Sequence, residues 1–145
     1  MITIPTSTHL VDLDPLECHR LLAAADVGRL VWHGPDGMTA IPVNHSWRDG
    51  RILIRTTAYS AIARECDDAE VGYEVDDLDP GRRLGWSVLA RGRARVLWTD
   101  ADRQAEPHPW PSGPRPLLLE VDVRSVHGRR LTQLPREPQR QPRRG

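Results

Sequence analysis

The chain has 145 residues, with 20 basic and 20 acidic side chains and 39% hydrophobic residues, which favours one domain or one domain with a tail. No run of about 18 apolar residues is present to span a membrane, no signal peptide is expected, and two cysteines do not make a disulfide framework. A cytoplasmic location is therefore expected. Every basic residue is arginine, so any anion site must use arginine, hydroxyls or backbone N–H groups.

The zero net charge conceals an asymmetry. Residues 129–145 carry a charge of +5, and residues 1–128 carry −5. An acidic body argues against specific nucleic-acid binding. The last stretch is rich in Pro, Arg and Gln and cannot bury enough apolar area to order itself. The sequence therefore predicts a domain over residues 1–131 and a disordered basic tail over residues 132–145.

The first predicted element is a helix over residues 15–25. Asp14 is a good N-cap, Pro15 suits the first helical position, and Glu17 follows the cap by three residues. Two shorter helices are predicted further along the chain: residues 59–66, capped by Thr57 or Ser60, and residues 99–105.

Between and after these helices the hydrophobic pattern has a period of two, which is typical of strands. Turn signals at residues 34–37, 49–50 and 77–81 separate the strands. Strands are predicted over residues 29–33, 38–47, 51–57, 70–76, 86–98 (bent at Gly92) and 117–123, with a short extension near Val126. About six mostly antiparallel strands with short connections indicate a small barrel or half-closed sheet.

Residues 55–60 (RTTAYS) are the most informative segment for chemistry. One arginine and three hydroxyls lie where a strand runs into a helix start, and such a place favours an anion such as a cofactor phosphate. The simpler interpretation is that Thr57 or Ser60 only caps the helix and Arg55 is solvated.

Several segments, taken in order, resemble the pyridoxamine 5'-phosphate oxidase-related proteins, the flavin-binding split barrels common in actinobacteria. The segments are residues 25–30 (ADVGRL), 40–44 (AIPVN), 55–57 (RTT), 74–80 (EVDDLDP), 85–89 (GWSVL), 91–94 (RGRA) and 128–131 (GRRL). The resemblance covers about residues 10–131. It implies a mainly β fold, a six-stranded antiparallel split barrel with flanking helices.

The resemblance also implies a homodimer with FMN at the subunit interface, or a deazaflavin (factor 420) in its place. Carried over to this chain, it places Val43 and Asn44 along the flavin ring, and it has Trp86 and Ser87 line the site, from the other subunit. The residues that would hold the ribityl phosphate are Arg55, Thr56, Thr57 and Ser60.

One departure from the family concerns the phosphate. Family members often read Arg-Thr-x-x-Gly-Thr-Lys here, and this chain has Tyr59 and Ala61 at the Gly and Lys positions. The leading hypothesis is a flavin- or deazaflavin-dependent oxidoreductase acting on a small molecule. The alternative is a non-catalytic member that retains no tightly bound cofactor and serves as a small-ligand-binding or interaction protein.

The other chemistry-bearing residues have simpler interpretations. His45 is predicted to be a surface strand residue. The histidines show no metal-ligand spacing, neither cysteine lies in a nucleophile motif, and the five tryptophans are expected in the core and at an interface. Cross-strand pairing is predicted between two charged sets, Arg91, Arg93 and Arg95 on one strand and Glu70, Glu74 and Asp76 on another.

Overall fold

The computed structural model describes residues 4, 6–98 and 107–136. Over these residues the chain is mainly β, as predicted. The elements in chain order are β1 (Thr6–Leu13), α1 (Pro15–Ala24), β2 (Val27–Gly34), β3 (Gly37–Asn44), β4 (Ser46–Arg48), β5 (Arg51–Thr56), α2 (Ala61–Cys66), β6 (Ala69–Asp79), β7 (Leu84–Leu97) and β8 (Leu117–Pro135). Neither described helix is long and apolar enough to cross a membrane.

The two helices start where the caps predict, with one adjustment. The Asp14 carboxylate accepts a hydrogen bond of 2.9 Å from the Glu17 N–H at the start of α1. Ser60 is the N-cap of α2, so this helix begins at Ala61, two residues later than predicted. The helix predicted over residues 99–105 lies outside the described residues.

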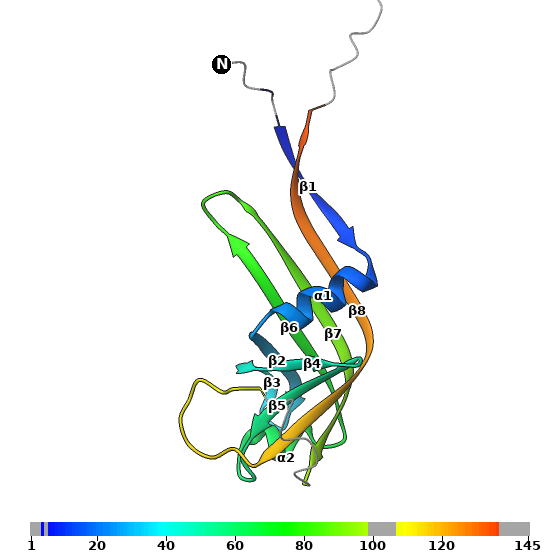
Figure 1. The fold of residues 1–145 in the computed structure, drawn as a ribbon. Coiled ribbons are helices and arrows are strands. Elements are labelled where there is room, and N and C mark those ends of the chain that lie inside the picture. The colour runs from blue at the N-terminus through cyan, green and yellow to red at the C-terminus, as the bar shows by residue number, and fades with distance from the viewer. Residues whose placement is uncertain (1–3, 5, 99–106, 137–145) are drawn as a thin grey trace, which may run out of the picture.

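The strands form one antiparallel sheet that curls on itself. Its order is β3-β2-β6-β7-β8-β5-β4, and β1 pairs with β8 off this path. The body is at one end, and two arms project from it, the β6–β7 hairpin and the β1–β8 ribbon (Figure 1). The core lies inside the curl and under the helices, with Trp32, Tyr73, Leu22, Leu30, Ile54 and Leu119 among its fully buried side chains.

Four strand predictions needed correction. No strand was predicted at β1, and the strand predicted over residues 38–47 is divided at His45 into β3 and β4. The predicted loop at residues 77–81 is mostly strand, because β6 continues to Asp79. Strand β8 continues to Pro135, so the expected boundary at residue 131 falls inside a strand and residues 132–135 are ordered against β1.

The predicted bend at Gly92 coincides with an irregularity in the pairing of β7 with β8. The register of β7 against β8 shifts between Arg91 and Gly92. A Cβ at Gly92 would collide with the backbone carbonyl of Asp122 on β8. Only glycine allows the two backbones to approach this closely at the bulge.

Candidate functional site

The segment of residues 55–60 forms the connection from β5 to α2. The Thr56 and Ser60 hydroxyls are 2.6 Å apart and share a hydrogen bond. The Ser60 hydroxyl donates to the Thr57 carbonyl at 2.9 Å and accepts from the Ala63 N–H at 3.1 Å. Thr56 is buried. These two hydroxyls therefore build the loop and cap the helix, and they leave Arg55 and Thr57 as the more accessible groups of the predicted phosphate site.

Two guanidinium groups belong to or reach this region, and they make different contacts. An Arg55 nitrogen (Nη1) lies 3.5 Å from the Pro116 carbonyl, to which it donates. An Arg64 nitrogen (Nη1) donates to the Tyr59 carbonyl inside the loop itself. The Tyr59 side chain is 89% exposed, so it does not fill the loop. Arg64 thus brings a cation to the loop in which Ala61 stands at the usual lysine position.

Val43 and Asn44 end strand β3 beside a cleft of about 500 Å³. The Asn44 amide nitrogen donates to the Asp26 carbonyl at 3.4 Å, and the amide oxygen accepts from the Trp110 backbone N–H at 2.9 Å. Asn44 therefore ties β3 to the end of α1 and to the loop that begins at residue 107. The other cleft residues include Ala25, Ser46, Trp47, Pro107 and His108.

The prediction that His45 is a surface residue is wrong. Its side chain is buried in the floor of this same cleft, 5% exposed. The imidazole bonds to α1 and to the buried Tyr73 hydroxyl. Burial lowers its pKa, although the backbone of Leu22 and the charge of Asp26 act in the opposite direction.

Trp86 and Ser87 are consecutive on β7, so their side chains point to opposite faces of the sheet. Trp86 packs against the core. Ser87 faces a second cleft, of about 480 Å³, at the base of the two arms. The charged and titratable groups of that cleft are Asp12, Glu74, Arg91, His127 and Arg129.

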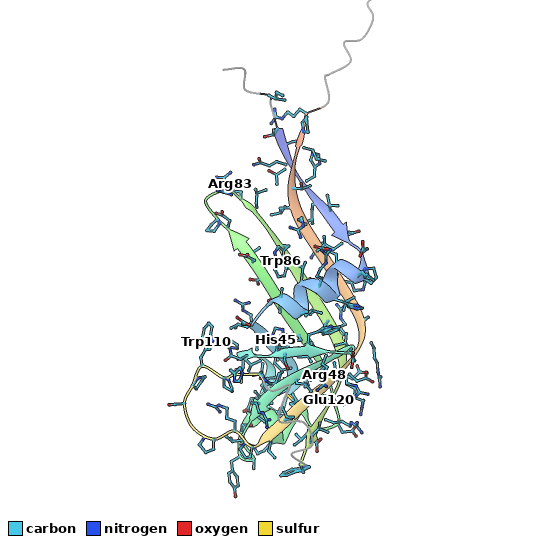
Figure 2. The ribbon with its side chains drawn as sticks, in the orientation of Figure 1. His45, Arg48, Arg83, Trp86, Trp110 and Glu120 are labelled. Carbon is cyan, nitrogen blue, oxygen red and sulfur yellow. The ribbon has the colours of Figure 1, made fainter. Side chains whose placement is uncertain are left out.

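Within one chain, the structure keeps Arg55 of the predicted phosphate site far from Trp86 and Ser87. Arg55 pairs with Leu118, which pairs with Leu97 on β7. Ser87 is ten residues further along β7, which corresponds to about 33 Å of extended strand. Trp86 lies on the β6–β7 arm, and α2 lies at the opposite end of the molecule (Figures 1 and 2).

The sequence reasoning missed a carboxylate pair beside this second cleft. An Arg29 nitrogen (Nη1) lies 3.3 Å from a Glu74 oxygen and 3.2 Å from an Asp76 oxygen. Burial and the adjacent Asp76 carboxyl raise the pKa of Glu74 to about 7, against the opposing effect of Arg29. The alternating acids of this strand were visible in the sequence. Their partner, Arg29 of β2, could not be predicted without knowing that β2 and β6 are neighbours in the sheet.

The two charged sets lie on neighbouring strands, as the predicted pairing requires, but most of the individual ion pairs are different. Strands β6 and β7 are neighbours, with Glu70 opposite Arg93. The individual ion pairs differ from the prediction: Arg93 binds Asp68 at 2.8 Å, Arg95 lies 3.8 Å from Glu120 of β8, and Arg29 contacts Glu74 and Asp76.

The remaining predictions concern metals, thiols and tryptophans. Within the described residues no cluster of His, Cys, Asp or Glu is arranged to hold a metal ion. Burial raises the pKa of the Cys18 thiol, and it raises that of Cys66 to about 12, so neither thiol is an activated nucleophile. Trp32 is buried as expected, whereas Trp98 and Trp110 are largely exposed.

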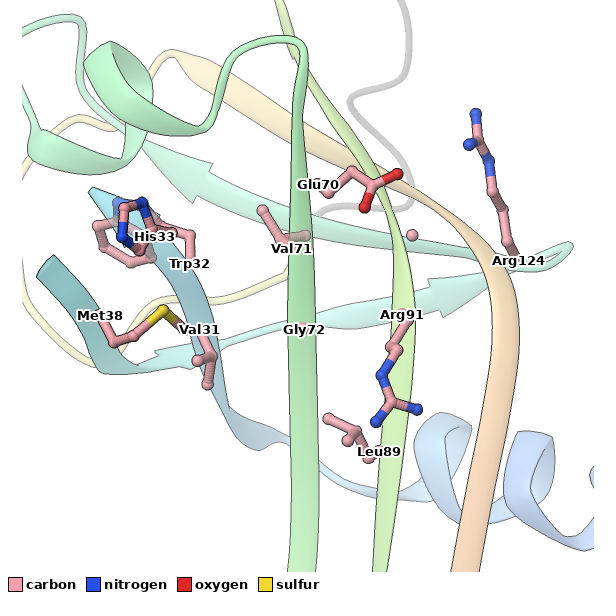
Figure 3. Close-up of a pocket in the computed structure, with 11 residues that line it drawn as sticks. Val31, Trp32, His33, Met38, Glu70, Val71, Gly72, Leu89, Arg91 and Arg124 are labelled. Atoms are coloured by element: carbon pink, nitrogen blue, oxygen red, sulfur yellow. The ribbon is translucent and has the colours of Figure 1, made fainter. Parts of the chain in front are cut away.

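A third cleft, of about 490 Å³, lies on the outer face of the sheet and contains none of the predicted site residues (Figure 3). Val31, Gly72 and Leu89 come from three adjacent strands, and the exposed Met38 stands beside them. Arg91, Arg124 and Glu70 line the same cleft. The structure shows here an apolar groove with a charged border.

Comparison with known proteins identifies the family. The family model described as pyridoxamine 5'-phosphate oxidase matches residues 14–130. An uncharacterized protein of Mycobacterium tuberculosis is 37% identical over 142 residues, covering 92% of this chain and 93% of that protein.

Solved structures agree with this match. A conserved protein of unknown function from Corynebacterium diphtheriae has 30% identity and a TM-score of 0.68, covering 85% of this chain and 98% of that one. The FAD binding protein from Mycobacterium smegmatis has 26% identity and a TM-score of 0.66, covering 84% and 98%. The chain therefore belongs to the pyridoxamine 5'-phosphate oxidase family, and the expected split-barrel fold is confirmed.

Proposed function

We propose that this protein is a flavin-dependent oxidoreductase that acts on a small molecule and holds its cofactor between two copies of the chain. The observation that carries the proposal is the loop of residues 55–60, which includes Arg55 and accepts a hydrogen bond from Arg64, in a chain of this family. The FAD-binding neighbour from Mycobacterium smegmatis supports a flavin. FMN is the proposed flavin, with FAD and a deazaflavin (factor 420) as the alternatives to test.

The loop has groups that suit a phosphate. Arg55 offers a two-pronged contact, Thr57 of the same loop carries a further hydroxyl, and Arg64 takes the place of the missing lysine cation. A bound flavin supplies the electron and hydride transfer itself. The chain holds the phosphate, orients the ring beside Val43 and Asn44, and keeps water away from the ring.

A second copy of the chain is part of this proposal. Ser87 and Arg55 are separated by about 33 Å of strand, so one flavin can touch both only when Trp86 and Ser87 come from the partner subunit. The projecting arms support this arrangement, because a two-stranded ribbon alone is marginal in water. Leu10, Val11 and Leu78 are exposed on the arms.

The apolar groove at Val31, Gly72 and Leu89 is the proposed contact between the two copies, since exposed apolar clefts of this kind mark interaction sites. Light scattering should give twice the 16.4 kDa chain mass. Leu89→Arg should give a monomer that binds flavin poorly. A monomeric L89R variant with unchanged flavin affinity would overturn the shared-site proposal.

The non-catalytic alternative is favoured by one observation. Ala61 provides no cation, and the Thr56 and Ser60 hydroxyls are already used inside the loop. A protein that is colourless when purified and binds neither FMN, FAD nor the deazaflavin at micromolar concentration would support this alternative and overturn the oxidoreductase proposal.

The phosphate contact is tested by substitution. Loss of one charge-assisted hydrogen bond costs about 1.5–3 kcal/mol, so Arg55→Ala should raise the flavin Kd at least tenfold (about one to two decades). Arg64→Ala should have a similar effect. Arg51→Ala is the matched control, because Arg51 is on the same strand but pairs with Glu120. Quenching of flavin fluorescence measures the Kd, and an unchanged value in R55A would place the phosphate elsewhere.

A further inference from the structure

His45 is the centre of a buried hydrogen-bonded group that the proposed chemistry does not use. It lies at the break between β3 and β4 and is 5% exposed. Its Nε2 is 2.8 Å from the Leu22 carbonyl of α1, and its Nδ1 is 2.6 Å from the Tyr73 hydroxyl of β6. The two rings meet edge to face at 4.8 Å between centroids.

The partners determine where the protons lie. The Leu22 carbonyl can only accept, so Nε2 carries a hydrogen. In the neutral imidazole Nδ1 then accepts from the Tyr73 hydroxyl. The hydroxyl oxygen also lies 3.4 Å from the Val43 carbonyl. Within the described residues no buried side-chain polar atom lacks a partner, so this group is fully satisfied with His45 neutral.

The group fixes the backbone on the C-terminal side of Asn44. The His45 N–H donates to the Asp26 carbonyl at 3.1 Å, and its ring is bonded to α1 and to β6. The Tyr73 oxygen lies 3.4 Å from the Val43 carbonyl on the other side, but its one hydrogen goes to Nδ1 while His45 is neutral. The Asn44 amide is thereby held toward the Trp110 backbone at the mouth of the cleft.

We propose that His45 and Tyr73 are a positioning pair for Asn44 in the ligand cleft, and that the pair holds Asn44 in place only while His45 is neutral. The inference rests on the proposed function in one respect, that Val43 and Asn44 lie along the flavin ring. On protonation Nδ1 becomes a donor to the Tyr73 oxygen, and the hydroxyl must turn to the Val43 carbonyl. The positive charge of His45 is then buried beneath the cleft. To expose this charge to water, the backbone segment that carries Asn44 must move out of its position.

The surroundings of His45 set the pH range. Burial lowers its pKa below the ordinary 6.5, and Asp26, at the end of α1, opposes this. The other titratable groups nearby are Tyr73 on β6, His108 across the cleft, and His19 on α1, which stacks on Trp47. We therefore expect the change at a pH below 6.5.

The decisive variant is His45→Gln. Its amide can donate to the Leu22 carbonyl and accept from the Tyr73 hydroxyl, but it takes up no proton in this range. In the wild type the Kd for FMN should rise at least fivefold between pH 7.5 and pH 5.0, and in H45Q it should stay flat. His108→Gln, which removes the other imidazole of the cleft, is the matched control and should keep the wild-type pH dependence.

Tyr73→Phe tests whether the pair positions Asn44 or only stabilises the fold. It should weaken FMN at every pH and move the side-chain amide signal of Asn44 in NMR spectra of the ligand-free protein. A variant that only lowers Tm, with the FMN Kd and the Asn44 signal unchanged, would overturn the inference.

The ligand-free NMR titration also keeps this test separate from the proposed function. If no flavin binds at any pH, the proposed function fails, but the Asn44 signal should still titrate in the wild type and not in H45Q. Identical Asn44 titration curves in the two proteins would overturn the positioning pair, whatever the flavin result.

Discussion

Gly28 of β2 lies directly against the ring of Tyr73, and this contact yields the most quantitative prediction. A Cβ built at Gly28 would stand 2.5 Å from the Tyr73 Cζ and 2.6 Å from its hydroxyl oxygen. Tyr73 is completely buried and is held by His45, so its ring cannot move away at low cost. Gly28→Ala must therefore displace the ring.

The expected cost has two parts. Overpacking a core costs about 1–3 kcal/mol, and breaking the buried bond between Tyr73 and His45 costs about 1–3 kcal/mol more. A destabilisation of about 3 kcal/mol lowers the Tm of a chain of this length by about 10 °C. Differential scanning calorimetry at pH 7.5 measures both quantities.

The double variant isolates the contact. In a Tyr73→Leu background the ring is absent, so Gly28→Ala should cost less than about 1 kcal/mol, which leaves a coupling energy of about 2 kcal/mol. Gly81→Ala is the control, because Gly81 is in an exposed turn and its new methyl would meet only the mobile end of the Asp79 side chain, at 3.3 Å. If Gly28→Ala costs the same in both backgrounds, or leaves Tm within 1 °C of the wild type, the reasoning is refuted.

Two further predictions concern the charged cleft and the β5–α2 loop. The folded-state pKa of Glu74, about 7, exceeds its ordinary 4.5, so the stabilisation from its proton is complete below pH 4.5 and is lost as pH rises to 7. Glu74→Gln should therefore raise Tm by a few degrees at pH 8 and not at pH 4.5; equal shifts at both pH values would contradict this. Ser60→Ala removes a helix cap and the partner of the buried Thr56 hydroxyl, so urea titration should show a loss of about 2 kcal/mol. The exposed loop change Ser112→Ala serves as its control, and a loss no greater than that of S112A would show that the loop does not depend on this hydroxyl.

Local patterns in the sequence were enough to predict the mainly β fold class and the first helix, and the order of several short segments resembled the family to which the chain belongs. Asp14 and Pro15 act through backbone geometry and a cap that involve only their immediate neighbours. The strands with one buried face, such as β6, show their pattern directly in the sequence. The bend expected at Gly92 coincides with a shift in register, and the close approach of the Asp122 carbonyl explains why glycine is needed there.

The rest depends on tertiary contacts that no local pattern contains. Strand β1 is exposed along nearly its whole length, and its sequence lacks the alternation of apolar and polar residues that predicts a strand. It is a strand because β8 pairs with it. His45 was predicted to lie on the surface, but it is buried. The partners that hold it there, Leu22 and Tyr73, are distant from it in sequence. The roles of Arg55, Thr56, Thr57 and Ser60 toward a ligand, and those of Val43, Asn44, Trp86 and Ser87, stay predictions until a cofactor titration is done.

The length of β8 also determines the order in which the fold can form. This strand pairs with β7, β5 and β1, and Thr6, near the start of the chain, pairs with Pro135 near its end. On the ribosome, β1 has no partner strand and β5 has only β4 until β8 emerges. Contacts so distant in sequence make folding slow, and edges that wait unpaired are prone to aggregation. Changes at the C-terminus should therefore affect the yield of folded protein through the N-terminal strand.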